Sequence, residues 1–446
     1  MQSLFLTAVF LSLLFMGFSA AFGAALGFVW VDIVKPQQLA SAILTDQPLS
    51  LVAAGAMLIL FMIKDRKAPS KVGAIQVLIL LFAIWVTLTT TMSNVPELPW
   101  IKWDWAFKVL VFAFLFPYIF RSRVQIEAFI LVFIFSAATI FFSAGVKTML
   151  GGGGYGVLAV MGAGNSGLSE SSTLAAVCAA LIPLIVYSMR HTLLLPKVWW
   201  RKALFIAIIV TAIATVVGTS ARTGVIALGI AGLFLLSKSK HKKWWITGGI
   251  VGAVILANID LSATPWGSRM STIETYNEDS SALGRLKVWE WTVEFVGQHP
   301  MGGGFNAYVH NGISEVMGDG TVIFYPEGML RGKAFHSIYF EVLGEQGIPG
   351  FIMYLSMFVL SLLKLRSLKR QWKAHPGMEW MVGLAEALTA SIVVFMVAGA
   401  FVGIAYQPFI FYMISLAVAI EQYSLRAQKE HKRRTGQARA KGLVIA

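Results

Sequence analysis

Long apolar stretches alternate with short polar gaps along most of the chain. The first stretch, 1–31, carries no charge. Because a membrane-spanning helix needs about 20 apolar residues, the pattern predicts about 12 or 13 spans, depending on whether this stretch is one tilted helix or two that turn near Gly23. The other predicted spans lie near 49–63, 72–92, 105–120, 124–143, 169–189, 203–218, 221–236, 244–259, 338–363, 381–401 and 404–420. We therefore predict an all-α polytopic membrane protein.

One polar gap is much longer than the others. Residues 260–337 have mixed polarity, and connections of this length usually carry function. Within the gap, Leu286, Trp289, Val293 and Val296 recur at helical spacing, which predicts an amphipathic helix on the outer leaflet or on the membrane bundle. The predicted domains are an N-terminal transmembrane bundle (1–259), a loop domain (260–337), C-terminal transmembrane helices (338–421) and a basic tail (422–446).

Composition indicates the same class of protein. Hydrophobic residues make up 57% of the 446 residues and charged residues 13%, with a mean hydropathy of +0.72. A soluble domain has about a quarter of its residues charged, so these values exclude a soluble globular enzyme and a disordered chain. The single cysteine, Cys178, can form no internal disulfide, which excludes a disulfide-stapled secreted domain. Its apolar surroundings favour a packing role.

The net charge of +14 is concentrated in particular gaps. Gaps rich in Lys and Arg alternate with gaps that are neutral or acidic. The positive-inside rule places the basic gaps and the C-terminus in the cytoplasm and 260–337 on the opposite face. The charge therefore indicates orientation and contact with anionic lipid headgroups rather than nucleic-acid binding. The basic gaps are 64–71, 121–123, 190–202, 237–243, 364–373 and the tail.

The candidate chemistry lies among the basic residues of the outer face. Arg222 stands in a tight polar turn, 218–224, between two apolar helices. An Arg within the membrane costs about 2.5–3.5 kcal/mol, so this side chain should face protein, water or an anion. Two interpretations stay open for Arg222: a snorkelling side chain at a helix end, or a phosphate ligand helped by the N-terminus of the following helix.

Three further residues of the long gap are candidates. His336 ends the gap at the start of a predicted helix, and a histidine can take a proton from a hydroxyl near neutral pH, although a lone histidine is often structural. Arg285 begins the predicted amphipathic helix, and Arg269 precedes it. Taken alone, each of these arginines is equally well explained as a solvated surface residue.

Four motifs carry a resemblance. The run 336–350 resembles the signature of the O-antigen ligase and polymerase superfamily, a His-Asn or His-Ser pair followed by Leu, Glu and Gly-Ile-x-Gly. The segment 300–306 is similar to the family's Pro-x-x-Gly-x-Gly segment. Gly284-Arg285 with Trp289 resembles its Arg and aromatic helix, and 220–224 resembles its Ser-x-Arg-x-Gly turn. The N-terminal third, with 34–36 and 100–103, resembles a subgroup described as O-glycosylation ligases.

The resemblance implies a membrane-embedded glycosyltransferase of the C type (GT-C) in the bacterial inner membrane, with its active site on the periplasmic face. The implied donor is a glycan on undecaprenyl pyrophosphate, and the implied acceptor is lipid A core, a protein or another glycan. His336 would be the catalytic base, and Arg222 and Arg285 would bind the donor pyrophosphate, since arginine forks stabilise a departing diphosphate. Direct displacement would invert the anomeric centre.

No cofactor and no metal are expected. The outer face has no Asp-x-Asp motif, and Glu278-Asp279 is interpreted as a solvated pair. Lys333 and Arg331 would lower the pKa of His336 or bind acceptor. Glu341 lies about 140° around the helix from His336 and is not expected to orient it, whereas Glu345 is expected to be a packing or interhelical partner. Secondary site candidates are Arg269, Lys108, Arg331, Ser337 and Tyr339.

Two alternatives stay open. A polysaccharide polymerase of the same superfamily would show the same motifs, because it consumes the same donor. A lipid-linked glycan transporter or flippase is less favoured, since transporters carry ionisable groups near the membrane midplane and paired halves with broken helices. In this chain the predicted spans are almost free of charge and show no internal repeat.

Overall fold

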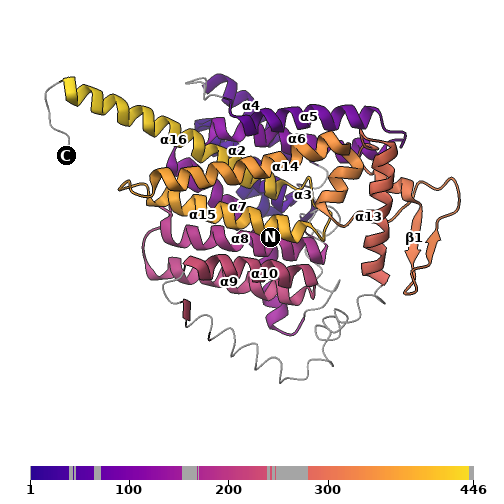
Figure 1. Cartoon of the computed structure of the whole chain (residues 1–446). Coiled ribbons are helices and arrows are strands. Elements are labelled where there is room, and N and C mark those ends of the chain that lie inside the picture. The colour runs from indigo at the N-terminus through magenta and orange to yellow at the C-terminus, as the bar shows by residue number, and fades with distance from the viewer. Residues whose placement is uncertain are drawn as a thin grey trace.

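The computed structural model describes residues 2–39, 44, 47–64, 72–152, 168, 170–238, 242–243, 247 and 280–440. The predicted span near 244–259, the candidate Arg269 and the pair Glu278-Asp279 lie outside these residues. The described helices pack side by side in a bundle. Helix α13 (Ser280–Gln298) crosses one end of this bundle, and α16 (Pro408–Ala440) extends beyond the other (Figure 1).

The elements follow the apolar stretches of the sequence. The N-terminal region holds α1 (Gln2–Ser19), α2 (Ala21–Val34), α3 (Pro36–Leu39), α4 (Leu49–Lys64), α5 (Ala74–Thr91), α6 (Leu98–Ile119), α7 (Arg123–Met149), α8 (Ser171–His191), α9 (Trp199–Gly218) and α10 (Arg222–Lys238). After α13 come a 3-10 helix (Ala307–Asn311), strands β1 (Ile313–Val316) and β2 (Val322–Phe324), α14 (Ile338–Trp372), α15 (Glu379–Gly399) and α16. The two strands form one antiparallel hairpin.

The predicted fold class is confirmed. Seven helices in the described residues are long and apolar enough to cross a membrane, and three shorter apolar helices, Ser3–Gly17, Ala21–Val34 and Leu49–Lys64, accompany them. The chain is therefore an all-α, multi-pass membrane protein, while the expected total of about 12 or 13 spans stays a prediction. The first apolar stretch is two helices that turn at Ala20, where the backbone is extended.

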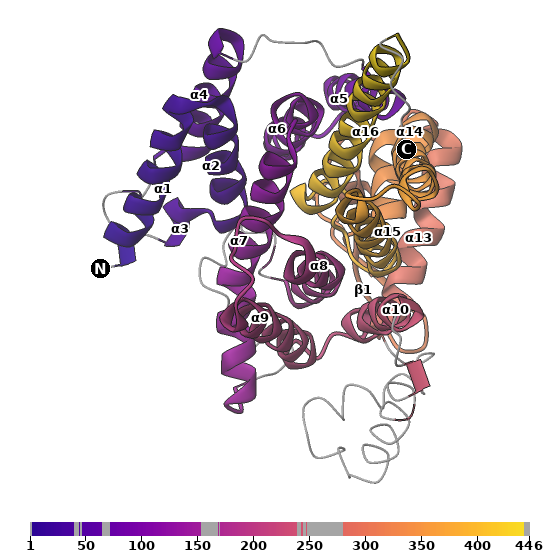
Figure 2. The ribbon, with the colours of Figure 1, turned by 90° about the vertical axis from the view of Figure 1, so that its left-hand side faces the viewer.

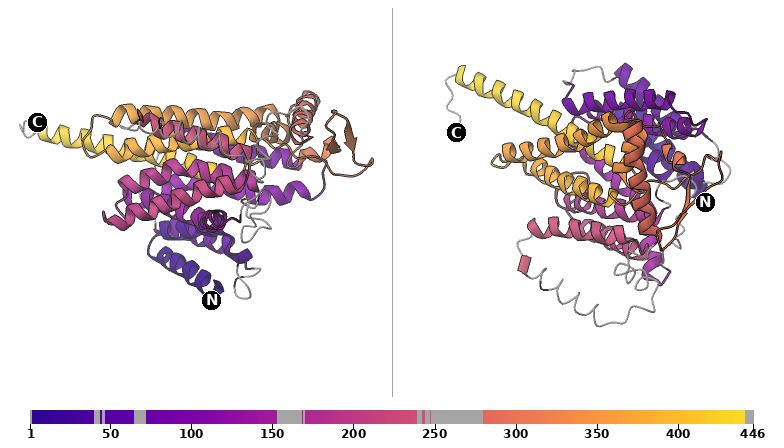
Figure 3. Two further views of the ribbon diagram at one scale, coloured as in Figure 1. Left: turned by 90° about the horizontal axis from the view of Figure 1, so that it is seen from below. Right: turned by 45° about the vertical axis from the view of Figure 1, so that its right-hand side comes forward.

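The predicted amphipathic helix is present as α13, which buries one side against protein and leaves two of the predicted apolar residues outside that side. Val288, Thr292 and Val296 are buried, whereas Leu286 and Val293 are about half exposed or more, at 51% and 59%. Val288 joins a small apolar core with the hairpin and with the chain that leads into α14. Helix α13 and the hairpin lie at the end of the bundle opposite the C-terminal part of α16 (Figure 3).

Helix α14 is broken near its start, and the preceding loop fills the break. Gly347 has φ +65° and ψ −169°, which interrupts the helix. Gly303 N donates to Gly344 O at 3.0 Å, and Ile348 N donates to Pro300 O at 2.9 Å. A Cβ on Gly302 would lie 2.4 Å from Gly347 N, so only glycine permits this approach of two backbones. The glycines at 302–304 thus join the loop domain to the membrane bundle.

Candidate active site

His336 lies where the loop domain meets α14, and α13 fixes the backbone on both sides of it. The carbonyl of Phe335 accepts a hydrogen bond of 2.8 Å from Trp289 Nε1. The Trp289 ring stacks on Phe340 with 4.8 Å between centroids, and the Phe335 ring is buried. His336 itself has φ +49°, a left-handed conformation that is uncommon outside glycine and is concentrated at functional sites.

The electrostatic surroundings keep the His336 imidazole neutral. Its pKa lies below the ordinary value of 6.5, first because the ring is largely buried and then because Arg285 and Lys333 are positively charged. Glu170 and Glu341 oppose this shift. A histidine with a lowered pKa is unprotonated at neutral pH and can accept a proton from a hydroxyl.

Arg285 and Lys333 are positioned beside each other near His336. A Cβ on Gly284 would lie 3.0 Å from Lys333 Nζ, so the lysine side chain passes over the start of α13 next to Arg285. Asn311 holds the lysine backbone, donating from Nδ2 to Lys333 O at 2.8 Å and accepting from Lys333 N at Oδ1. His336, Arg285 and Lys333 therefore form one corner between α13 and α14, with two cations beside one neutral imidazole.

Arg222 begins α10 on the same end of the bundle. A Cβ on Gly224 would lie 2.8 Å from Ala175 Cβ, which places the first turn of α10 against the second turn of α8. The N-cap of α8 is Glu170, whose charge acts on His336. The start of α8 thus lies near the start of α10 and near His336. Figure 2 shows α8 and α10 alongside α15. Arg222 thus lies at the same end of the bundle as His336 on a separate helix, and it is not among the charges that shift the pKa of His336.

Sequence reasoning missed a buried ionic cluster behind this corner. Lys102 Nζ on α6 lies 2.7 Å from Glu341 Oε1 and 2.7 Å from Glu345 Oε1, both on α14. Glu341 also accepts from Ala405 N at 3.0 Å, and Glu345 accepts from Asn306 N at 2.8 Å. The cluster ties α6, the glycine loop and the α15–α16 connection to α14. The signal available in the sequence was the spacing of Glu341 and Glu345, four residues apart, together with a lysine, Lys102, predicted on the same side of the membrane.

The comparisons with known proteins place this geometry in a family. Residues 206–355 match the family model described as O-antigen ligase. Residues 206–355, the O-antigen ligase region, are thus the part of the chain that is similar to this family. The O-antigen ligase region contains Arg222, Arg285 and His336, and it also contains the glycines at 302–304 and the helix break at Gly347 that they contact. Residues 1–193 match a family of unknown function (DUF5935). The comparison with curated proteins finds no match.

The secondary candidates in and around the O-antigen ligase region lie in different surroundings. Ser337 is the N-cap of α14, and its buried hydroxyl has no hydrogen-bond partner among the described residues. The Tyr339 hydroxyl donates to Met396 O on α15 at 3.0 Å. Lys108 pairs with Asp104 on the exposed side of α6. Arg331 is exposed, and it is not among the charges that shift the pKa of His336.

The structure therefore gathers Lys333 and Ser337 at the His336 corner and directs Tyr339 and Lys108 toward other contacts. Glu345, expected as an interhelical partner, contacts α6 through Lys102. Glu341 raises the pKa of His336 by its charge, while its carboxylate contacts Lys102 and Ala405. In the part of the chain that the structure describes, no three His, Cys, Asp or Glu side chains gather as metal ligands.

Proposed function

We propose that this protein is a GT-C type glycosyltransferase of the O-antigen ligase kind. It transfers a glycan from undecaprenyl pyrophosphate to a hydroxyl of lipid A core, a protein or another glycan, at the periplasmic face of the bacterial inner membrane. The observation that carries the proposal is the corner in which a neutral His336 lies beside Arg285 and Lys333, within the O-antigen ligase region.

The proposed reaction is a single displacement without a metal. His336 takes the proton of the acceptor hydroxyl, and the acceptor oxygen forms a bond to the anomeric carbon from the face opposite the pyrophosphate. The bond between that carbon and the pyrophosphate oxygen breaks, and the electron pair leaves with the diphosphate. Arg285 and Arg222 stabilise the departing charge through paired hydrogen bonds. This displacement inverts the anomeric centre.

Transfer in detergent is the direct test. We expect the purified chain to move a labelled glycan from a polyprenyl pyrophosphate donor to an acceptor in micelles, where a transporter has nothing to transport. We expect EDTA to leave the rate unchanged, because the charge is carried by arginines. Attachment of one preformed glycan indicates a ligase, and stepwise elongation indicates a polymerase. No transfer from any such donor by a folded sample would contradict the proposal, and a loss in EDTA that Mg²⁺ restores would contradict the metal-free step.

The pH profile tests the state of His336. Because the base must be unprotonated, activity should fall as pH drops through its pKa, and the lowered pKa places this acidic limb below pH 6.5. Lys333→Ala removes one of the charges that lower the pKa, so the limb should move to higher pH. Arg331→Ala, two residues earlier and exposed, should leave the limb in place. Initial rates between about pH 5 and 8 measure this shift. An acidic limb at the same pH in Lys333→Ala and Arg331→Ala would refute the influence of Lys333 on the pKa of His336.

A further inference from the structure

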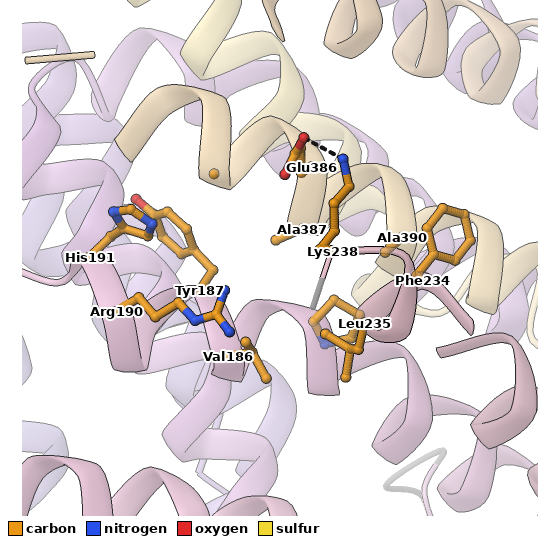
Figure 4. Close-up of a pocket in the computed structure, with 12 residues that line it drawn as sticks. Val186, Tyr187, Arg190, His191, Phe234, Leu235, Lys238, Glu386, Ala387 and Ala390 are labelled. Carbon is orange, nitrogen blue, oxygen red and sulfur yellow. Dashed lines mark hydrogen bonds and ion pairs between the residues drawn. The ribbon is translucent and has the colours of Figure 1, made fainter. Parts of the chain in front are cut away.

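A cavity lined by apolar side chains and a few charged ones lies at the end of the bundle opposite the His336 corner. Helix α8 begins at Glu170 near His336 and ends at His191, and its last turns line this cavity together with α10 and α15. The cavity measures about 130 Å³. Figure 4 shows Tyr187, Arg190, Lys238 and Glu386 around it. None of these residues belongs to the proposed transferase site.

The cavity and its continuation carry an excess of positive charge. Glu386 accepts from Lys238 Nζ at 2.7 Å and from Lys369 Nζ at 2.6 Å, so one carboxylate is shared by two ammonium groups. Arg190 and Arg366, which also line this space, form no ion pair within the described part of the chain. The two cavities are therefore lined by four cations and one carboxylate, an excess that favours an anionic ligand.

Tyr187 lines the cavity with its aromatic ring. The Tyr187 side chain is only 3% exposed, and its hydroxyl makes no hydrogen bond with any described residue. Its ring stacks on His191 with 5.3 Å between centroids. The hydroxyl is too deeply buried to touch a ligand in the cavity and lies on the side of His191, away from Lys238 and Glu386 (Figure 4), so the charged side chains supply the polar contacts of the cavity.

A second, more apolar cavity adjoins the first along α14. This second cavity, about 460 Å³, shares Phe234, Lys238 and Glu386 with the first. Its other walls are mainly apolar side chains of α14 and α15, among them Val359 and Leu363, which are 50% and 55% exposed. Lys369 lies ten residues beyond Val359, about 15 Å along the helix. A charged opening thus leads into a groove long enough for much of an acyl chain.

We propose that these two cavities bind one anionic phospholipid, such as phosphatidylglycerol. Its phosphodiester lies between Arg190 and Lys238, and an acyl chain follows α14 past Leu363. The apolar continuation favours a lipid over a free phosphate, and the excess of cations favours an anionic headgroup over a zwitterionic one. Basic pockets between transmembrane helices bind such headgroups on the cytoplasmic side, where the positive-inside rule places this end.

Lipid titration of the purified full chain, followed by native mass spectrometry in detergent, tests this site. We expect one phosphatidylglycerol to bind more tightly than phosphatidylcholine, and inorganic phosphate not to displace it. Arg190→Ala should weaken binding about fivefold, since one basic residue near a headgroup contributes about 1 kcal/mol. Leu363→Trp, which fills the groove at an exposed position, should weaken it as well. Lys202→Ala is the matched control, because Lys202 is exposed on the same predicted face outside both cavities.

Each outcome decides the proposal. Equal affinity of phosphatidylglycerol for wild type, Arg190→Ala and Leu363→Trp would overturn it, as would equal binding of phosphatidylcholine. Displacement by inorganic phosphate with no effect of Leu363→Trp would show a soluble-anion site in place of a lipid site. Thermal unfolding of each variant without added lipid shows that the substitutions leave the fold intact, so a change in affinity reports on the cavities. The transferase proposal is unaffected by any of these results.

Discussion

His336→Ala is expected to lower the rate of glycan transfer by about 10²–10⁴-fold, the usual contribution of a general base. The imidazole is held unprotonated by burial and by the charges of Arg285 and Lys333, and alanine offers nothing to accept the proton of the acceptor hydroxyl. Donor binding should change little, because the proposed pyrophosphate ligands remain. The measurement is the initial rate of transfer in detergent at saturating donor, together with the donor KM.

The matched control is His299→Ala. His299 is exposed just after α13, where its ring stacks on Phe295 with 4.5 Å between centroids. This variant should keep the wild-type rate. Wild-type activity in purified, folded His336→Ala protein would remove the base assignment. An equal loss in both variants would point to damage of the loop domain in place of lost chemistry.

Lys102→Ala is expected to destabilise the protein by about 3–5 kcal/mol, the typical effect of removing one partner from a buried ion pair. Two carboxylates, Glu341 and Glu345, would then face each other near the start of α14 without a cation. Because Glu345 also holds the backbone of Asn306, the glycine loop should loosen and transfer should fall with stability. Unfolding of detergent-purified variants by denaturant measures the loss.

Lys108→Ala provides an unusually close comparison. Lys108 lies on the same helix α6 and forms an ion pair of the same length, 2.7 Å, with Asp104, but both partners are about half exposed. Exposed pairs contribute about 0–1 kcal/mol, so this variant should unfold near wild type. Similar stability losses in the two variants would show that burial does not set the strength of the Lys102 cluster. A Lys102→Ala protein as stable as wild type would contradict its structural role.

The amino-acid sequence was sufficient for the membrane class, the placement of most helices and the existence of α13. These features follow from runs of apolar residues and from local periodicity, which are visible along a single segment. Which side of α13 is buried by protein could not be predicted, because Leu286 and Val293 have the same spacing whether they face protein or the outer leaflet, and the second placement stays a prediction. Packing against α14 and the hairpin selects Val288 and Thr292 in their place.

The site was only partly predictable for the same reason. His336, Arg285 and Arg222 stand out by residue type and motif, and Lys333 could be associated with His336 because it is near in sequence. The pairing of Lys102 with Glu341 and Glu345 joins segments more than 200 residues apart, and no periodicity reports such a contact. The glycines at 302–304 could be interpreted as tight backbone, but their partner, the break at Gly347, appears only when the two segments are brought together.

The interruption of α14 has a consequence for membrane insertion. A helix that stops within the bilayer leaves carbonyl groups exposed to hydrocarbon, which is costly unless protein supplies the donors. Here the carbonyls of Gly344 and Glu345 accept from Gly303 and Gly304, and that of Gln346 accepts from the Trp85 indole of α5. All three donors precede α14 in the chain, so they are synthesised before the segment that needs them. We therefore expect the loop that ends at Gly304 and helix α5 to be in place first, with the interrupted helix α14 docking onto them afterwards.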